Sequence, residues 1–247
     1  DLHPRVRRQR QLCIRDRKAI GVILIFPWYL YFAPIVINYF LKLYTVYIAN
    51  DFSTNSLNAF FNLFIGIATA IPLIIVFKGF IKENWLVFKK DFLENIIWVL
   101  TIGIGLAYLF SIAGELIVNL VAPQSGEAAN QTLVETLVQS NFLLMFFQSV
   151  IIAPFIEELL FRGLIFNSLR QKNMVWAHLI SAFLFGLLHV YSYILAGDMS
   201  EWIKLIPYMM AGLSFSIVYE KRQTIIAPII LHAAKNLIAV LLMATMF

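Results

Sequence analysis

The sequence predicts an all-α fold, a polytopic transmembrane bundle of seven or eight helices that encloses a polar cavity within the membrane. Two features of the composition predict this class: hydrophobic residues make up 61% of the 247 positions, and charged residues only 13%. Soluble domains are about 45–50% apolar and about 25% charged. The third observation is that the apolar residues form runs of about 20 residues, the length that crosses the hydrocarbon core of a bilayer.

The chain begins with a basic segment, residues 1–18, which contains seven Lys and Arg residues. A signal peptide carries fewer charges and has a cleavage site after its apolar core, so we predict that the apolar run 19–41 is a retained first span. The basic segment should stay in the cytoplasm and lie against anionic lipid. Cys13 is the only cysteine, so no internal disulfide is expected.

Two further spans are predicted in the first half of the chain. Residues 42–56 have the composition of a loop, and the second span follows at 57–77. Residues 78–94 contain four lysines, with aromatic residues among them, and are predicted to form a cytoplasmic loop at the membrane interface. The third span is predicted at 96–121.

Residues 122–139 are the longest polar stretch between spans and contain acidic residues but no Lys or Arg. We predict an outer loop there. Alternatively, either 78–95 or 122–140 could add an interfacial or re-entrant helix. The bundle would then have eight membrane elements in place of seven.

Four more spans are predicted in the second half, at 141–168, 174–195, 202–219 and 225–246. The sequence shows no internal repeat and no inverted-repeat symmetry. Its predicted organisation is a basic N-terminal segment (1–18), a set of N-terminal spans (19–140) and a C-terminal catalytic membrane core (141–247).

The distribution of positive charge orients this arrangement. Fifteen of the 19 Lys and Arg residues fall in segments predicted on one side, namely 1–18, 78–94, 169–173 and 220–223. Positive residues in short loops favour the cytoplasmic side, so we expect an integral membrane protein with a cytoplasmic N-terminus. The net charge of +5 follows from this bias and does not indicate nucleic-acid binding. The small size and plain loops favour a bacterial or archaeal plasma membrane.

The stretch Pro154–Gly163 places three charged residues inside an apolar span. Charges within a membrane are unfavourable by roughly 2.5–3.5 kcal/mol each on insertion scales, which favours a functional role. Glu158 and Arg162 are spaced i, i+4, so they share a helix face and can neutralise each other. Glu157 points about 100° away and is less well paired. We predict a supporting pair, Glu158 and Arg162, and a general base, Glu157; the alternative is that both glutamates only stabilise the bundle.

Two later spans contribute further polar side chains. His189 lies in the fifth span, four residues after Phe185. His232 and Asn236 share a helix face in the seventh span at i, i+4. A single histidine is usually a hydrogen-bonded core residue, and a His–Asn pair can be a contact between helices. At about 1.5 Å per residue, however, these groups and Glu157 reach depths that can meet, so we expect one cavity in the inner half of the bilayer, opening to the cytoplasm.

These residue types can hydrolyse an amide with water. A carboxylate and an imidazole can together activate a water molecule, and a second imidazole with a carboxamide can stabilise an oxyanion. The sequence has no Gly-x-Ser-x-Gly motif, no His-Glu-x-x-His motif and no glycine-rich phosphate loop. Glu157, His189 and His232 are also zinc ligands by type, so a catalytic Zn²⁺ is the alternative to a mechanism that requires no cofactor. Lys235 and Glu115 are weaker candidates for the site.

The order of these residues along the chain resembles a known family. Three motifs on successive spans are similar to those of the CPBP family, the CAAX proteases and bacteriocin-processing enzymes also called Abi proteins: Glu157-Glu158-x-x-x-Arg162, Phe185-x-x-x-His189 and His232-x-x-x-Asn236. The similarity covers about residues 141–240. It implies that Glu157 and His189 activate the water, and that the histidine and asparagine of the third motif stabilise the oxyanion. It also implies that Glu158 and Arg162 support the site and that Phe185 lines the pocket.

The residues leave three functions open. The one we favour is an intramembrane endopeptidase that hydrolyses a peptide bond of a CAAX-type prenylated protein or of a bacterial peptide precursor. Its partners are then a peptide or lipidated protein substrate and membrane lipid, with no nucleic acid. The second is a non-catalytic membrane scaffold or a bacteriocin-immunity protein. The third, a proton-coupled transporter, is disfavoured because repeats and paired broken helices are absent.

Overall fold

The computed structural model describes residues 24–25, 27–47 and 54–245. Every regular element of this described part is helical, which confirms the predicted all-α class. Six helices in it are long and apolar enough to cross a membrane: Thr54–Lys90, Phe92–Val121, Phe142–Leu169, Met174–Leu195, Glu201–Arg222 and Ile226–Thr245. They correspond to the second to seventh predicted spans and confirm a polytopic helical bundle.

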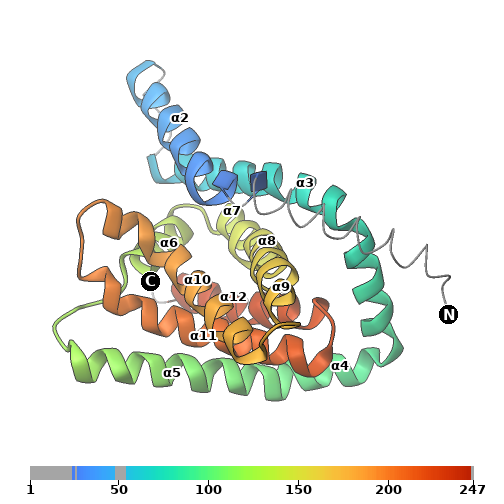
Figure 1. Cartoon of the computed structure of the whole chain (residues 1–247). Helices are drawn as coiled ribbons and strands as arrows, with labels where there is room; N and C mark the ends of the chain where they lie inside the picture. The colour runs from blue at the N-terminus through green and yellow to red at the C-terminus, as the bar shows by residue number, and fades with distance from the viewer. Residues whose placement is uncertain (1–23, 26, 48–53, 246–247) are drawn as a thin grey trace.

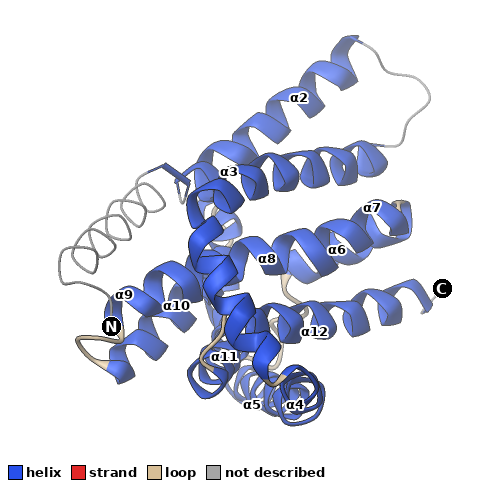
Figure 2. Ribbon diagram, turned by 90° about the vertical axis from the view of Figure 1, so that its right-hand side faces the viewer, coloured by secondary structure: helices blue, strands red, loops and turns tan. Residues whose placement is uncertain are grey.

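The first predicted span is described only from residue 24. A π-helical segment, η2 (Trp28–Phe32), leads into α2 (Ala33–Tyr47), so the helix ends six residues later than expected. α2 packs against α3 (Thr54–Lys90) and projects away from the other helices in both Figure 1 and Figure 2. The predicted basic segment 1–18, with Cys13, lies outside the described residues.

The lysine-rich stretch 78–94, predicted as a loop, is almost entirely helical. α3 continues to Lys90, and only Asp91 separates it from α4 (Phe92–Trp98). α3 contains Pro72, which removes a backbone hydrogen bond, and the helix bends before it turns along the end of the bundle (right-hand side of Figure 1). The loop prediction was wrong, and the alternative of a helix at 78–95 describes this stretch. Composition did not separate the two, because a helix that covers the end of a bundle has the polar composition of a loop.

The polar stretch 122–139 also contains a helix, as the alternative for 122–140 foresaw. The third span runs from α4 through η3 (Val99–Gly103) and α5 (Ile104–Val121), and α6 (Ala129–Ser140) follows. α6 buries Leu137 and Val138 in a cluster with Met145 and Val240. It therefore docks against the fourth and seventh spans at the end of the bundle opposite the lysines.

The fourth span is one continuous helix whose winding changes along its length. Asn141 caps its start, because the Asn141 side chain accepts a hydrogen bond from the backbone N–H of Leu144 at 3.2 Å. The elements then follow without a break: α7 (Phe142–Phe146), η4 (Phe147–Ile152), α8 (Ala153–Glu158), η5 (Leu159–Phe166) and α9 (Asn167–Leu169). η4 and η5 are π-helical, a winding that is rare and frequently occurs at functional sites.

The remaining helices surround the fourth span. α10 (Met174–Leu195) and α11 (Glu201–Arg222) pack together along their length, α11 also packs on α5, and α12 (Ile226–Thr245) contacts the fourth span (Figure 1). The close approach of α10 and α11 requires glycine at 186, because a Cβ there would lie 2.9 Å from the carbonyl oxygen of Leu205. α10, α11 and α12 therefore surround the fourth span.

The packed core lies toward the end of the bundle that carries the lysine-rich connections. Phe88, Phe161 and Phe166 are fully buried there. By contrast, Leu109 and Leu120 on α5 are 62% and 83% exposed. Large exposed apolar faces mark contact with lipid or with a partner, and on helices of membrane-crossing length they fit the hydrocarbon of the bilayer.

Candidate active site

Glu158 and Arg162 form a buried ion pair at the centre of the bundle. Nη1 of Arg162 donates to Oε1 of Glu158 at 3.0 Å, the i, i+4 pairing expected from the sequence, and both side chains are 0% exposed. Nη2 of Arg162 donates to the carbonyl oxygen of Gly212 at 2.5 Å. The guanidinium also lies over the Phe185 ring, 4.8 Å from its centroid. Arg162 therefore ties the fourth span to α10 and α11.

His232 on α12 reaches the same glutamate. Its Nδ1 lies 3.0 Å from Oε1 of Glu158, and because a carboxylate oxygen only accepts, the hydrogen is assigned to Nδ1. The imidazole stacks on Phe215, with ring centroids 4.6 Å apart. Nε2 faces Glu157, whose Oε2 is 3.9 Å away. One imidazole thus contacts both glutamates of the fourth span, through different ring nitrogens.

Glu157 faces the cavity and has one oxygen held and one free. Its Oε1 accepts a hydrogen bond from the Tyr29 hydroxyl at 3.1 Å. Its Oε2 makes no hydrogen bond to any group in the described part of the chain. The side chain is 8% exposed. A carboxylate in the cavity wall, with one oxygen held and the other without a hydrogen-bond partner among the described groups, can accept a proton from a bound water.

His189 and Asn236 present the other polar groups. Nδ1 of His189 donates to the carbonyl oxygen of Phe185 at 2.9 Å, which leaves Nε2 as an acceptor. The His189 ring stacks on Tyr208, with centroids 4.4 Å apart and planes 17° from parallel. Nδ2 of Asn236 donates to the carbonyl oxygen of Ser149 at 2.8 Å. The second N–H of that carboxamide is available for a ligand.

A cavity of about 420 Å³ connects these groups. Its lining includes the four predicted catalytic residues: Glu157, His189, His232 and Asn236. Phe185 also lines it, as expected, whereas Glu158 and Arg162 lie behind its wall. Small-molecule sites span about 300–1,000 Å³, so the cavity is large enough for a short piece of polypeptide and water. The structure therefore brings the residues of all three motifs together.

The cavity extends in the direction opposite to the one expected. Its lining on α10 runs from Phe185 to Tyr193, and its lining on α12 runs from His232 to Met243, in both cases away from the basic connections. The expected site in the inner half, opening toward those connections, therefore does not match the lining. Counting residues from the ends of spans gave the depths of the polar groups, but it carries no information about which half of the bundle is packed.

Several polar lining residues were not singled out from the sequence, among them Tyr29, Gln148 and Tyr208. Gln148 could have been identified from the sequence, because a side-chain amide inside an apolar span is unusual in the same way as a carboxylate. The two tyrosines could not have been, since tyrosine is common near both membrane interfaces. Of the weaker candidates, Lys235 lines the cavity, whereas Glu115 is exposed on α5.

The three residues named for a zinc ion do not form a metal-binding group. Within the described residues, no three or more His, Cys, Asp or Glu side chains are placed to hold a metal ion. Nδ1 of His189 and Nδ1 of His232 are already hydrogen-bonded, as is Oε1 of Glu157. As placed, these side chains do not supply the three converging ligands that a catalytic zinc site needs.

Comparison with known proteins connects these motifs to one family. Residues 139–238 match the family model described as type II CAAX prenyl endopeptidase Rce1-like. The chain is 30% identical over 188 residues to the Bacillus subtilis protein named "Putative membrane peptidase YdiL", which covers 71% of this chain and 68% of that protein. It is also 30% identical over 163 residues to the UPF0177 protein YxdF of Lactococcus lactis, covering 64% of this chain and 81% of that protein.

The similarity also reaches the N-terminal helices. An uncharacterized protein of Mycoplasma capricolum is 27% identical over 240 residues, or 92% of this chain and 68% of that protein. No solved structure is significantly similar to the chain. The motif residues from Glu157 to Asn236 all lie inside the segment 139–238, whereas Tyr29 lies outside it. The resemblance to the CPBP family inferred from the motifs is confirmed.

Proposed function

The chain belongs to the type II CAAX prenyl endopeptidase Rce1-like family, and we propose that it is an intramembrane endopeptidase in which Glu157 and His189 activate a water molecule. Family membership and six membrane-length helices make it a multi-pass membrane protein of a peptidase family. The observation that carries the proposal is that acid, imidazole and carboxamide groups from three spans line one cavity. The proposed reaction has no metal-dependent step and no cofactor.

Two acceptors are available to the water. Oε2 of Glu157 has no other hydrogen bond among the described groups, and Nε2 of His189 is free because Nδ1 carries the hydrogen. In the proposed step the water gives a proton to Glu157 while its oxygen forms a bond to the carbonyl carbon of the substrate. General bases of this kind contribute about 10²–10⁴-fold to the rate.

The oxyanion that forms needs hydrogen-bond donors. The second N–H of Asn236 is one, since the first is used by the carbonyl of Ser149. Nε2 of His232 donates only when the ring is an imidazolium, because Nδ1 already donates to Glu158, whose carboxylate stabilises that cation. Glu157 then passes its proton to the leaving nitrogen and the C–N bond breaks. The products are a carboxylate and an amine.

The substrate and the membrane orientation complete the proposal. The substrate is a polypeptide, taken from a CAAX-type prenylated protein or from a bacterial peptide precursor, and membrane lipid surrounds the enzyme. The host membrane is a bacterial or archaeal plasma membrane. The connections rich in Lys and Arg lie in the cytoplasm, as the charge bias predicts.

The test is cleavage by the purified protein in lipid vesicles, with internally quenched lipidated and leader-type peptides. Glu157→Gln and His189→Ala are each expected to lower kcat about 100-fold or more. Glu115→Gln is the matched control, since it is the same substitution in the same membrane on an exposed position of α5. Cleavage that survives both active-site substitutions would refute the assignment. Cleavage that a chelator abolishes, and that added Zn²⁺ restores, would refute the metal-free mechanism.

A further inference from the structure

The cavity and the basic connections lie at opposite ends of the bundle. On the fourth span, the lining runs from Met145 to Glu157, and beyond Glu157 the side chains are packed away from it. Leu159, Leu160 and Phe161 are all 0% exposed. The half of the bundle that leads to the connection 169–173 is therefore closed by core packing.

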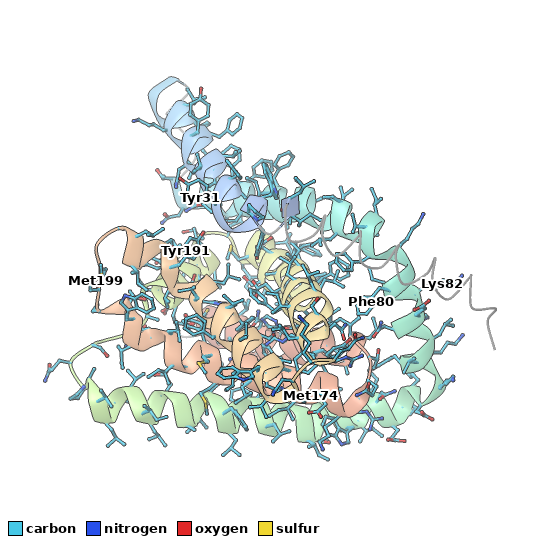
Figure 3. All side chains as sticks on the ribbon, in the orientation of Figure 1. Tyr31, Phe80, Lys82, Met174, Tyr191 and Met199 are labelled. Carbon is cyan, nitrogen blue, oxygen red and sulfur yellow. The ribbon has the colours of Figure 1, made fainter. Side chains whose placement is uncertain are left out.

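The other end of the cavity is bordered by α6. Asn130, Gln131 and Val134 of this helix line the cavity, and Gln131 is exposed. Ser192, near the C-terminal end of α10, is both a lining residue and exposed. In Figure 3, Tyr191 and Met199 lie at the left of the molecule, whereas Lys82 lies at the right. The exposed residues of the cavity lining therefore lie at the end of the bundle opposite the lysine-rich connections.

The charges at the two ends determine which side of the membrane each one faces. In the described part, the connections 78–94, 169–173 and 220–223 carry eight Lys and Arg residues. The connections 122–140 and 196–204, at the other end, carry four acidic residues and one lysine. Because Lys and Arg in short connections are retained in the cytoplasm, the α6 end faces the opposite side.

We infer that the cavity opens to the extracytoplasmic face, so that its substrate is a polypeptide segment exposed on that side, such as an exported peptide or an outer segment of a membrane protein. The inference rests on the proposed function for its substrate, and on the lining and charge distribution for its direction. It removes from consideration the lipidated tails of proteins that stay in the cytoplasm.

The direction can be tested without any proteolysis, by single cysteines and a charged thiol reagent that does not cross membranes. In a Cys13→Ser background, Ala239→Cys places a thiol in the cavity lining on α12 and Gln131→Cys places one at its mouth on α6. Gln171→Cys, exposed in the connection 169–173, is the matched control for the other side. Intact cells and inverted membrane vesicles present opposite faces to the reagent.

The expected result is that Ala239→Cys and Gln131→Cys react at least 10-fold faster in intact cells, and that Gln171→Cys reacts only in inverted vesicles. Faster reaction of Ala239→Cys from the cytoplasmic face would overturn the inference, and so would its failure to react from either face while Gln131→Cys reacts. The pattern should be the same in Glu157→Gln protein. Absence of cleavage by protein that keeps Glu157, together with the expected labelling pattern, would count against the proposed function alone. A reversed labelling pattern with normal cleavage would count against the direction alone.

Discussion

Replacing Arg162 by methionine should be among the most destabilising single changes in the second half of the chain. Arg162 is fully buried and makes charged hydrogen bonds to Glu158 at 3.0 Å and to the carbonyl of Gly212 at 2.5 Å. Arg162→Met would leave the Glu158 carboxylate buried without its cation. Removing one partner of a buried pair costs about 3–5 kcal/mol, and we expect the free energy of unfolding to fall by that amount.

A double-mutant cycle separates the ion pair from simple loss of packing. Glu158→Gln alone leaves the Arg162 cation without its partner, whereas Glu158→Gln with Arg162→Met removes both charges of the pair and keeps an acceptor for His232. The double variant should therefore be more stable than the sum of the single effects predicts, by a coupling energy of about 2–3 kcal/mol. The matched control is Arg170→Met, because Arg170 is partly exposed and lies 5.6 Å from the Tyr219 ring centroid, and its loss should cost about 1 kcal/mol or less.

The assay is reversible unfolding in mixed detergent micelles, followed by helical circular dichroism as the fraction of denaturing detergent rises. Two results would show that the reasoning is wrong. One is an Arg162→Met variant no less stable than Arg170→Met. The other is a cycle in which the two single effects simply add, since that would mean that Glu158 and Arg162 do not stabilise each other.

Three further changes have definite expected outcomes. Tyr29→Phe should lower kcat about 10-fold with KM unchanged, because it removes only the hydrogen bond that holds Glu157, worth about 1.5 kcal/mol; equal kcat in steady-state kinetics would contradict this. Asn236→Ala should lower kcat about 10²–10³-fold in the same assay, and a change confined to KM would argue against an oxyanion donor. Gly186→Ala should destabilise the protein by about 1–3 kcal/mol, because the added Cβ would lie 2.9 Å from the backbone of α11. Gly105→Ala is the control and should not destabilise it, since its Cβ would have no neighbour within 4 Å. Equal unfolding midpoints for the two variants would rule out the close approach of α10 and α11.

Much of the site follows from the sequence because helices impose fixed spacing. The pairing of Glu158 with Arg162 is a direct result of the i, i+4 geometry, and the structure has it at 3.0 Å. The meeting of Glu157, His189 and His232 follows from their similar depths, since membrane helices are held roughly across the same slab. Apolar runs of sufficient length likewise predict the six long helices.

Other features depend on tertiary packing, which the sequence pattern does not reveal. Tyr29 reaches Glu157 from 128 positions away, and nothing in its local sequence distinguishes it from a tyrosine at the interface. The direction of the cavity depends on which half of the bundle is filled by large side chains such as Phe161 and Phe166. The lysines of α3 were assigned to a loop because composition does not separate a helix on the end of a bundle from a connection.

The fourth span has a further property that arises from its winding. η4 and η5 close hydrogen bonds over five residues in place of four, on either side of the short α8 that carries Glu157 and Glu158. Each extra residue turns the following side chains by about 100° around the axis relative to an unbroken α-helix. The direction in which the two glutamates point around the helix axis therefore depends on the number of residues in η4 as well as on the residue types. A one-residue deletion in η4 that restored α winding would therefore keep the carboxylates in phase with the part of the span that begins at Phe142. A substitution that restored α winding without removing a residue would keep every motif residue, yet it would rotate the carboxylates by about 100°.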